Sequence, residues 1–122
     1  MENELENYER PIAFEKPCLV CKKQFESKLL EHYIFFETQF QLEGKIFDFF
    51  LPEKNLLVEI DGIFWHSRDY KEGKLSFESL YPVQKKIFTN DKLKASLAEE
   101  NGFSLIRIWE TDIETFDIVS IV

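Results

Sequence analysis

Acidic residues and a histidine are concentrated in one apolar segment, FDFFLPEKNLLVEIDGIFWH, which runs from Phe47 to His66. The acids are Asp48, Glu59 and Asp61, and the histidine closes the segment. A carboxylate among apolar side chains is costly unless it has a partner, and a divalent cation is one such partner. Metal-dependent hydrolysis of phosphodiester bonds uses sites of this kind. The segment therefore indicates a nuclease.

The spacing of the three acids determines whether they can meet. Glu59 and Asp61 are two residues apart, so in a strand their side chains lie on the same face. Asp48 approaches Glu59 if its strand pairs with the next one through a turn at Pro52–Asn55. The three carboxylates would then offer the oxygen ligands that Mg²⁺ prefers. The alternative is a solvated sheet face, but the apolar run Leu56–Val58 favours a strand that is buried on both faces.

Two helices are expected where apolar residues recur every three or four positions. The first covers residues 24–36, with Leu30 and Tyr33 among the members of its apolar stripe. The second covers residues 83–101, with Leu93 among the residues on its inner face. Such stripes face the core of a globular domain.

Three regions of alternating or continuous apolar residues predict strands: 37–51, Leu56–Ile60 and Phe103–Trp109. The order of helices and strands predicts an α/β (α+β) fold with a single mixed β-sheet flanked by helices. We divide the chain into an N-terminal arm, residues 1–23, which contains both cysteines, and a domain of residues 24–122.

Composition restricts the classes of protein further. The chain has 122 residues, 44% of them hydrophobic, and a formal net charge of −8. That charge argues against a stand-alone DNA binder of high affinity, because such domains carry a basic footprint. No apolar run is long enough to span a bilayer. Residues 1–17 are polar and acidic, without a signal-peptide core, so we expect a loose lead-in and a cytoplasmic protein.

The two cysteines, Cys18 and Cys21, have the CxxC spacing of one zinc knuckle. A structural zinc needs four ligands; His32 is a candidate for the third, and the sequence offers no clear fourth. Two interpretations remain open. Either a second chain completes the zinc site, or the segment is a turn with two free thiols.

The acidic segment resembles a known signature. Asp48 followed by Glu59–Asp61 resembles the D…ExK signature of the PD-(D/E)xK nucleases, with Asp61 where most members have lysine. The stretch GIFWH, which ends at His66, is similar to the GCFWH segment of the very-short-patch-repair (Vsr) endonucleases. A related group of phage homing endonucleases shares a Glu, Asp, His, Asp active site. The resemblance implies a restriction-endonuclease-like core.

The C-terminal half extends the resemblance. Asn90–Lys92, a helix, and the stretch from Asn101 to Glu110 are similar to the N…RD…L…GW…VWE pattern of the repair endonucleases. The resemblance covers about residues 24–112. It implies a Mg²⁺- or Mn²⁺-dependent DNA endonuclease or nicking endonuclease, working in the cytoplasm, or in the host cytoplasm if a phage encodes it.

The resemblance also implies a role for each matched residue. Asp48 is the principal metal ligand, and the backbone carbonyl of Ile60 and the carboxylate of Glu59 complete the protein ligands. His66 is the general base for the attacking water, or the group that orients it. Asp91 hydrogen-bonds His66 and sets its tautomer.

Further roles are implied with alternatives. Glu26 matches the family's N-terminal glutamate, which binds metal-bound water; Glu31 is the less suitable match. Phe64 and Trp65 match an aromatic pair that wedges between base pairs, and the alternative for both is core packing. The family's structural zinc is expected to be absent or replaced by Cys18 and Cys21, because its ligands are not matched in this sequence.

Two other functions remain open at this point. The chain is an interaction module with a nuclease fold that has lost its metal, or it is a catalytic subunit that acts as a homodimer or with a DNA-binding partner. The charge of −8 favours both over an independent DNA-binding enzyme.

Overall fold

The centre of the structure is a four-stranded sheet with the strand order β1-β2-β3-β4. The computed structural model describes residues 12–121, with side chains from residue 19 on. The strands are β1 (Glu37–Leu42), β2 (Lys45–Leu51), β3 (Leu56–Asp61) and β4 (Ser104–Trp109). The first three are antiparallel neighbours, whereas β3 and β4 are parallel. The predicted α+β fold with one mixed sheet is therefore confirmed.

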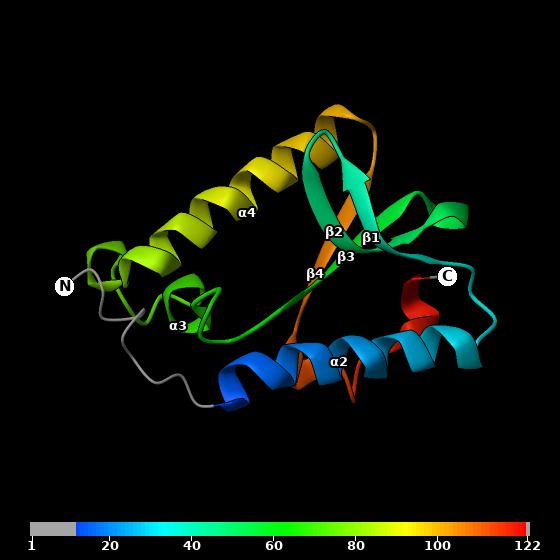
Figure 1. The fold of residues 1–122 in the computed structure, drawn as a ribbon, viewed down its shortest axis with the longest axis horizontal. Coiled ribbons are helices and arrows are strands. Elements are labelled where there is room, and N and C mark those ends of the chain that lie inside the picture. The colour runs from blue at the N-terminus through cyan, green and yellow to red at the C-terminus, as the bar shows by residue number, and fades with distance from the viewer. Residues whose placement is uncertain (1–11, 122) are drawn as a thin grey trace.

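Helices cover both faces of this sheet (Figure 1). Helix α2 (Ile12–Glu31) lies on one side, and helix α4 (Pro82–Glu100) lies on the other. A parallel pair such as β3 and β4 needs a long crossover connection, and α4 is the main part of that crossover. Within residues 12–121, no helix combines the length and the apolar character needed to cross a bilayer.

Strand β3 is the most buried element, and all six of its residues are buried. Its alternate side chains pack on opposite faces, as the pleat requires. Val58 and Ile60 belong to one core cluster with Phe25 of α2. Leu57 belongs to the cluster that contains Ala98 of α4. Glu59 and Asp61 share the parity of Leu57, so both acids are on the α4 side of the sheet.

Two turns join the antiparallel strands, and the one at Pro52–Asn55 was predicted correctly. Glu43 and Gly44 join β1 to β2 with φ values of 47° and 84°, the positive values that a tight hairpin turn requires. A 3₁₀ turn over Pro52–Lys54 joins β2 to β3, and Asn55 completes it with φ of 51°. This second turn folds Asp48 back toward β3.

Helix α2 differs from the helix expected over residues 24–36 and from the loose arm expected over residues 1–17. It starts twelve residues earlier, at Ile12, and it includes Pro17. A proline this close to the beginning of a helix removes one hydrogen bond, and the burial of Phe25 and Leu29 further along anchors the helix. Residues 1–11 lie outside the described part of the chain.

The end of α2 is also earlier than expected. Tyr33 adopts φ of 56°, and the N–H of Ile34 donates to the carbonyl of Leu29 at 2.9 Å. This is the geometry of a helix C-cap, which glycine usually occupies. The expected inward positions of Leu30 and Tyr33 are wrong, since the two residues are 59% and 96% exposed.

Helix α4 begins and ends within one residue of the prediction, but its inner face is different. Leu93 was expected to face inward and is 52% exposed. The buried residues of α4 include Asp91, Lys94 and Ala98. The spacing of three and four positions places all three on one side of the helix. A polar stripe of α4 therefore faces the acids of β3.

The region between β3 and α4 contains helix α3 (Arg68–Lys71) and a 3₁₀ turn over Phe77–Ser79. At the other end of the chain, the 3₁₀ segment η4 (Ile118–Ile121) lies beside α2 in Figure 1, drawn in red. Ile118 is buried in the same core cluster as Phe25, so the tail completes the α2 side of the core.

Candidate functional site

Asp48 and Glu59 are joined by hydrogen bonds between side chain and backbone. The backbone pairing of β2 with β3 reaches Phe49 and Val58. At the next position, the N–H of Asp48 donates to Oε2 of Glu59 at 2.9 Å. Oδ2 of Asp48 in turn accepts from the N–H of Ile60 at 2.8 Å. The carboxylates thus take the place of backbone carbonyls, and the structure brings the two acids together.

A lysine from each helix neutralises one of these acids. Nζ of Lys22 on α2 lies 2.9 Å from Oδ1 of Asp48. Nζ of Lys94 on α4 lies 2.8 Å from Oε1 of Glu59. Burial raises the pKa of Glu59, and the charge of Asp48 adds to the rise while Lys94 opposes it. Glu59 therefore depends on Lys94 for its charge in this environment.

A second group of acids surrounds His66. Nδ1 of His66 lies 2.7 Å from Oδ2 of Asp91 on α4, and Nε2 lies 3.7 Å from Oδ1 of Asp61 on β3. One ligand atom from each of the three residues lies within 4.8 Å of the other two, a spacing that fits a metal ion. The structure thus brings His66 and Asp91 together as the resemblance implied, and it adds Asp61.

Arg107 of β4 connects the two groups. Its Nη1 lies 2.9 Å from Oδ1 of Asp61 and 3.9 Å from Oε1 of Glu59. Its Nη2 lies 3.4 Å from Oδ1 of Asp91, where it is buried without a partner of hydrogen-bonding geometry. Lys71 of α3 adds a further cation, 3.2 Å from Oδ2 of Asp91.

The charges of the site balance within the described residues. Four carboxylates are each within 3.2 Å of a cationic nitrogen. The acids are Asp48, Glu59, Asp61 and Asp91, and the cations are Lys22, Lys71, Lys94 and Arg107. Partners of this kind allow so many acids to lie close together.

The two aspartates beside His66 have pKa values shifted in opposite directions. Burial raises the pKa of Asp61, although His66, Arg107 and Lys71 oppose the rise. Burial also tends to raise the pKa of Asp91. The hydrogen bond from His66 and the charges of His66, Arg107 and Lys71 outweigh burial there, so the pKa of Asp91 is lowered. Asp91 is therefore the more strongly stabilised anion of the two.

Other predicted site residues lie on α2 and β3. Glu26 is half-buried on α2, one turn from Lys22, and it makes no hydrogen bond or ion pair with the described residues. Glu31 is exposed at the end of the same helix. The N–H of Ile60 binds Asp48, and the proposed use of its carbonyl as a metal ligand stays a prediction.

The CxxC segment is helical, because both cysteines lie within α2, so the expected turn is wrong. Sγ of Cys21 donates to the backbone carbonyl of Glu110 at 3.0 Å. Burial, with help from the charge of Glu110, raises the pKa of the Cys21 thiol. The side chain of Cys18 lies outside the described part of the chain, so zinc binding stays a prediction.

Phe64 and Trp65 are both half-buried and pack against one another. Their ring centroids are 5.0 Å apart in an edge-to-face arrangement. The ring of Phe64 also lies 5.9 Å from that of Tyr81, which precedes α4. These contacts hold the pair against the domain, and the proposed insertion into DNA stays a prediction.

The four cations were not identified from the sequence, although two of them leave a signal there. Arg107 interrupts an otherwise apolar strand, and Lys94 is spaced three residues from Asp91 on an inward-facing helix. A charged residue at such a position needs a buried partner.

Comparison of the sequence with protein-family models and with curated proteins found no match.

Proposed function

We propose that this chain is a Mg²⁺-dependent DNA endonuclease with a restriction-endonuclease-like core, which hydrolyses phosphodiester bonds in the cytoplasm. The observation that carries the proposal is the pairing of His66 with Asp91 beside the interlocked carboxylates of Asp48 and Glu59. A base held by a carboxylate, next to a set of oxygen ligands, is what metal-assisted hydrolysis needs.

Asp48 and Glu59 are the residues that would hold the metal. Both offer carboxylate oxygens, which suit Mg²⁺, and the Asp48 side chain is the more exposed of the two, at 13%. A bound divalent cation would supply charge to offset the negative charge that develops on the phosphoryl group. A cation at Oδ1 of Asp48 would displace Lys22 from that oxygen, and we propose that the lysine charge then contacts a DNA phosphate.

His66 would receive the proton of the attacking water. Asp91 accepts a hydrogen bond from Nδ1, which leaves Nε2 as the basic nitrogen of a neutral imidazole. Nε2 lies 3.7 Å from Oδ1 of Asp61, which is beyond hydrogen-bonding distance, so Nε2 makes no hydrogen bond with that acid. Lys71 and Arg107 hold Asp91 in place from the other sides.

A second candidate is an interaction module with a nuclease fold and no activity. The observation that favours it is the balance of charge, since every acid of the site has a cationic partner. The net charge of −8 also favours a variant of the first proposal, in which a homodimer or a DNA-binding partner supplies the affinity for DNA.

Nicking of supercoiled plasmid DNA in the presence of Mg²⁺ or EDTA tests the proposal. We expect the wild-type protein to nick the plasmid with Mg²⁺, Asp48→Ala to be inactive, and Glu53→Ala, an exposed acid in the adjoining turn, to match the wild type. Titration calorimetry with Mn²⁺ should show at least one bound ion, which Asp48→Asn loses. Equal activity of wild type and Asp48→Ala, or no ion bound by the wild type, would overturn the proposal.

A further inference from the structure

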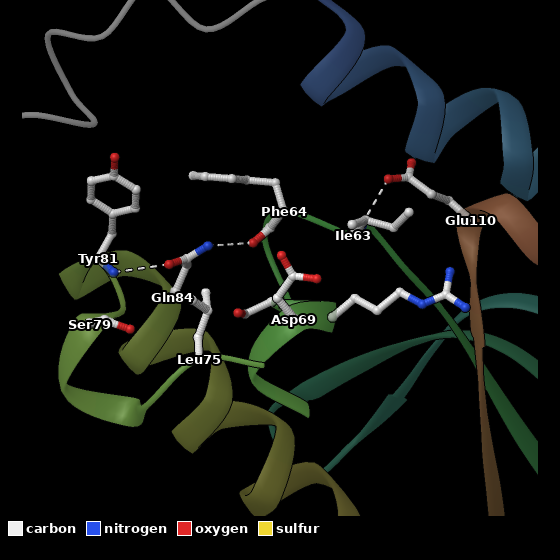
Figure 2. A pocket seen from close by; sticks show the side chains of 10 residues that line it. Ile63, Phe64, Asp69, Leu75, Ser79, Tyr81, Gln84 and Glu110 are labelled. Carbon is white, nitrogen blue, oxygen red and sulfur yellow. Dashed lines mark hydrogen bonds between the residues drawn. The ribbon is translucent and has the colours of Figure 1, made fainter. Parts of the chain in front are cut away.

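A cavity of about 490 Å³ opens beside the segment that carries His66. Phe64, Leu75 and Tyr81 provide apolar walls, and Asp69 and Glu110 are among the polar residues that line it. Figure 2 shows Tyr81 and Glu110 at opposite ends of the cavity, with Phe64 and Asp69 between them. Its volume is in the range of small-molecule sites.

A buried glutamine fixes the walls of this cavity. Gln84 of α4 is 8% exposed. Its Nε2 donates to the carbonyl of Phe64 at 2.7 Å, and its Oε1 accepts from the N–H of Tyr81 at 2.9 Å (Figure 2). The two aromatic residues are thus held in place with their ring centroids 5.9 Å apart, which lowers the entropic cost of binding a ligand against them.

Two carboxylates on the cavity wall keep free acceptor oxygens, whereas the Arg68 guanidinium on the same wall already donates to Glu72 and Thr111. The Asp69 carboxylate is exposed and accepts no hydrogen bond from the described residues. Glu110 uses Oε2 to accept from the N–H of Ile63 at 2.8 Å, so Oε1 remains. These two carboxylates attract a ligand that donates hydrogen bonds.

We propose that this cavity binds one unpaired nucleobase, with guanine preferred, and this inference rests on the proposed nuclease function. Guanine presents N1–H and N2–H side by side, which match the two oxygens of a carboxylate such as that of Asp69. Thymine has a single donor, and adenine places an acceptor beside its amino group. The rings of Phe64 and Tyr81 offer apolar surface for the faces of any base.

The position of the cavity connects it to the candidate active site. Phe64 is two residues from His66, and two residues of extended chain span at most about 7 Å. A base taken out of its stack into the cavity would therefore bring its own backbone close to His66. Removal of a base from the stack is an established way for an enzyme to read DNA.

Titration with the four deoxynucleosides tests the inference without metal or cleavage. The side-chain amide of Gln84 is the NMR probe, because it bonds directly to the cavity wall. We expect deoxyguanosine to bind about tenfold more tightly than thymidine. Asp69→Asn should remove this preference, whereas Glu78→Gln, an exposed acid that does not line the cavity, should retain it.

The outcomes separate this inference from the proposed function. Equal binding of all four deoxynucleosides, or a preference that survives in Asp69→Asn, would overturn the guanine pocket even if the protein nicks DNA. A protein that binds deoxyguanosine through Asp69 but never nicks DNA would support the pocket and count against the nuclease. Asp69→Asn should bind Mn²⁺ as the wild type does, which excludes general misfolding.

Discussion

Nζ of Lys22 lies 2.9 Å from Oδ1 of Asp48, on the carboxylate that we propose as the metal ligand. A lysine and a metal ion cannot occupy the same oxygen together, so the two compete. We expect Lys22→Met to bind Mn²⁺ about three- to fivefold more tightly than the wild type, which corresponds to the loss of one partly exposed ion pair. Titration calorimetry measures the change.

Lys23→Met is the matched control for this prediction, because Lys23 is the exposed neighbour on the same helix. If both variants bind Mn²⁺ alike, the effect comes from net charge and the competition is disproved. If Lys22 transfers to a phosphate during the reaction, Lys22→Met should also nick DNA more slowly in spite of its tighter metal binding.

The buried pair of Lys94 and Glu59 gives a prediction about stability. Lys94→Met leaves the Glu59 carboxylate buried without its closest cation, and breaking a buried pair in this way costs about 3 kcal/mol at neutral pH. The double variant Lys94→Met/Glu59→Gln should recover part of that loss, because the amide carries no charge. Urea unfolding measures the free energy of each variant.

Lys86→Met is the control on the same helix, since Lys86 is exposed, and its unfolding free energy should remain within about 0.5 kcal/mol of the wild type. A Lys94→Met protein as stable as this control would show that the ion pair is not needed for folding.

His66 as general base predicts a loss of rate without a loss of metal. We expect His66→Ala to nick DNA about 10²- to 10⁴-fold more slowly while its Kd for Mn²⁺ stays unchanged. The other histidine, His32, is exposed in the turn that follows α2, so His32→Ala is a control that should behave as the wild type. Weaker Mn²⁺ binding by His66→Ala would instead identify His66 as a ligand, together with Asp61 and Asp91.

Asp91 gives a prediction for the dependence of stability on pH. Its pKa is lowered in the folded protein, whereas an unfolded aspartate titrates near pH ~3.9. The folded state therefore binds fewer protons, and the stabilisation by Asp91 is complete above about pH 5 and is lost as the pH falls through the lowered pKa. Asp91→Asn should be less stable by about 1–3 kcal/mol at pH 7.

The difference between wild type and Asp91→Asn should shrink as the pH falls from about 5 to about 3. Asp69→Asn provides the comparison, because Asp69 is exposed and unpaired among the described residues. Urea unfolding at several pH values measures both differences. A difference that is constant over this range would mean that the Asp91 charge contributes nothing to folding.

The sheet and the meeting of its acids could be predicted because both follow from short-range patterns. The apolar run Leu56–Val58 predicts a strand that is buried on both faces, and the turn at Pro52–Lys54 sets the register that places Asp48 beside Glu59. Period-two alternation then places Asp61 on the same face as Glu59.

The cations of the site could not be predicted in the same way. Lys22, Lys94 and Arg107 come from three different elements, and local patterns do not specify which side chains meet across a core. The length of α2 was mistaken for a related reason. Pro17 and Tyr33 have low helix or cap preferences, and the packing of Phe25 and Leu29 outweighs them.

Two backbone amides, linked by hydrogen bonds to the carboxylates of Asp48 and Glu59, respond to whatever binds those carboxylates. The N–H groups of Asp48 and Ile60 point at carboxylate oxygens rather than at carbonyls. Any proton or cation that binds those oxygens weakens them as acceptors, and the NMR signals of the two amide protons must move. The chemical shifts of these two amide protons therefore show whether a proton or a cation occupies the site, without an added label.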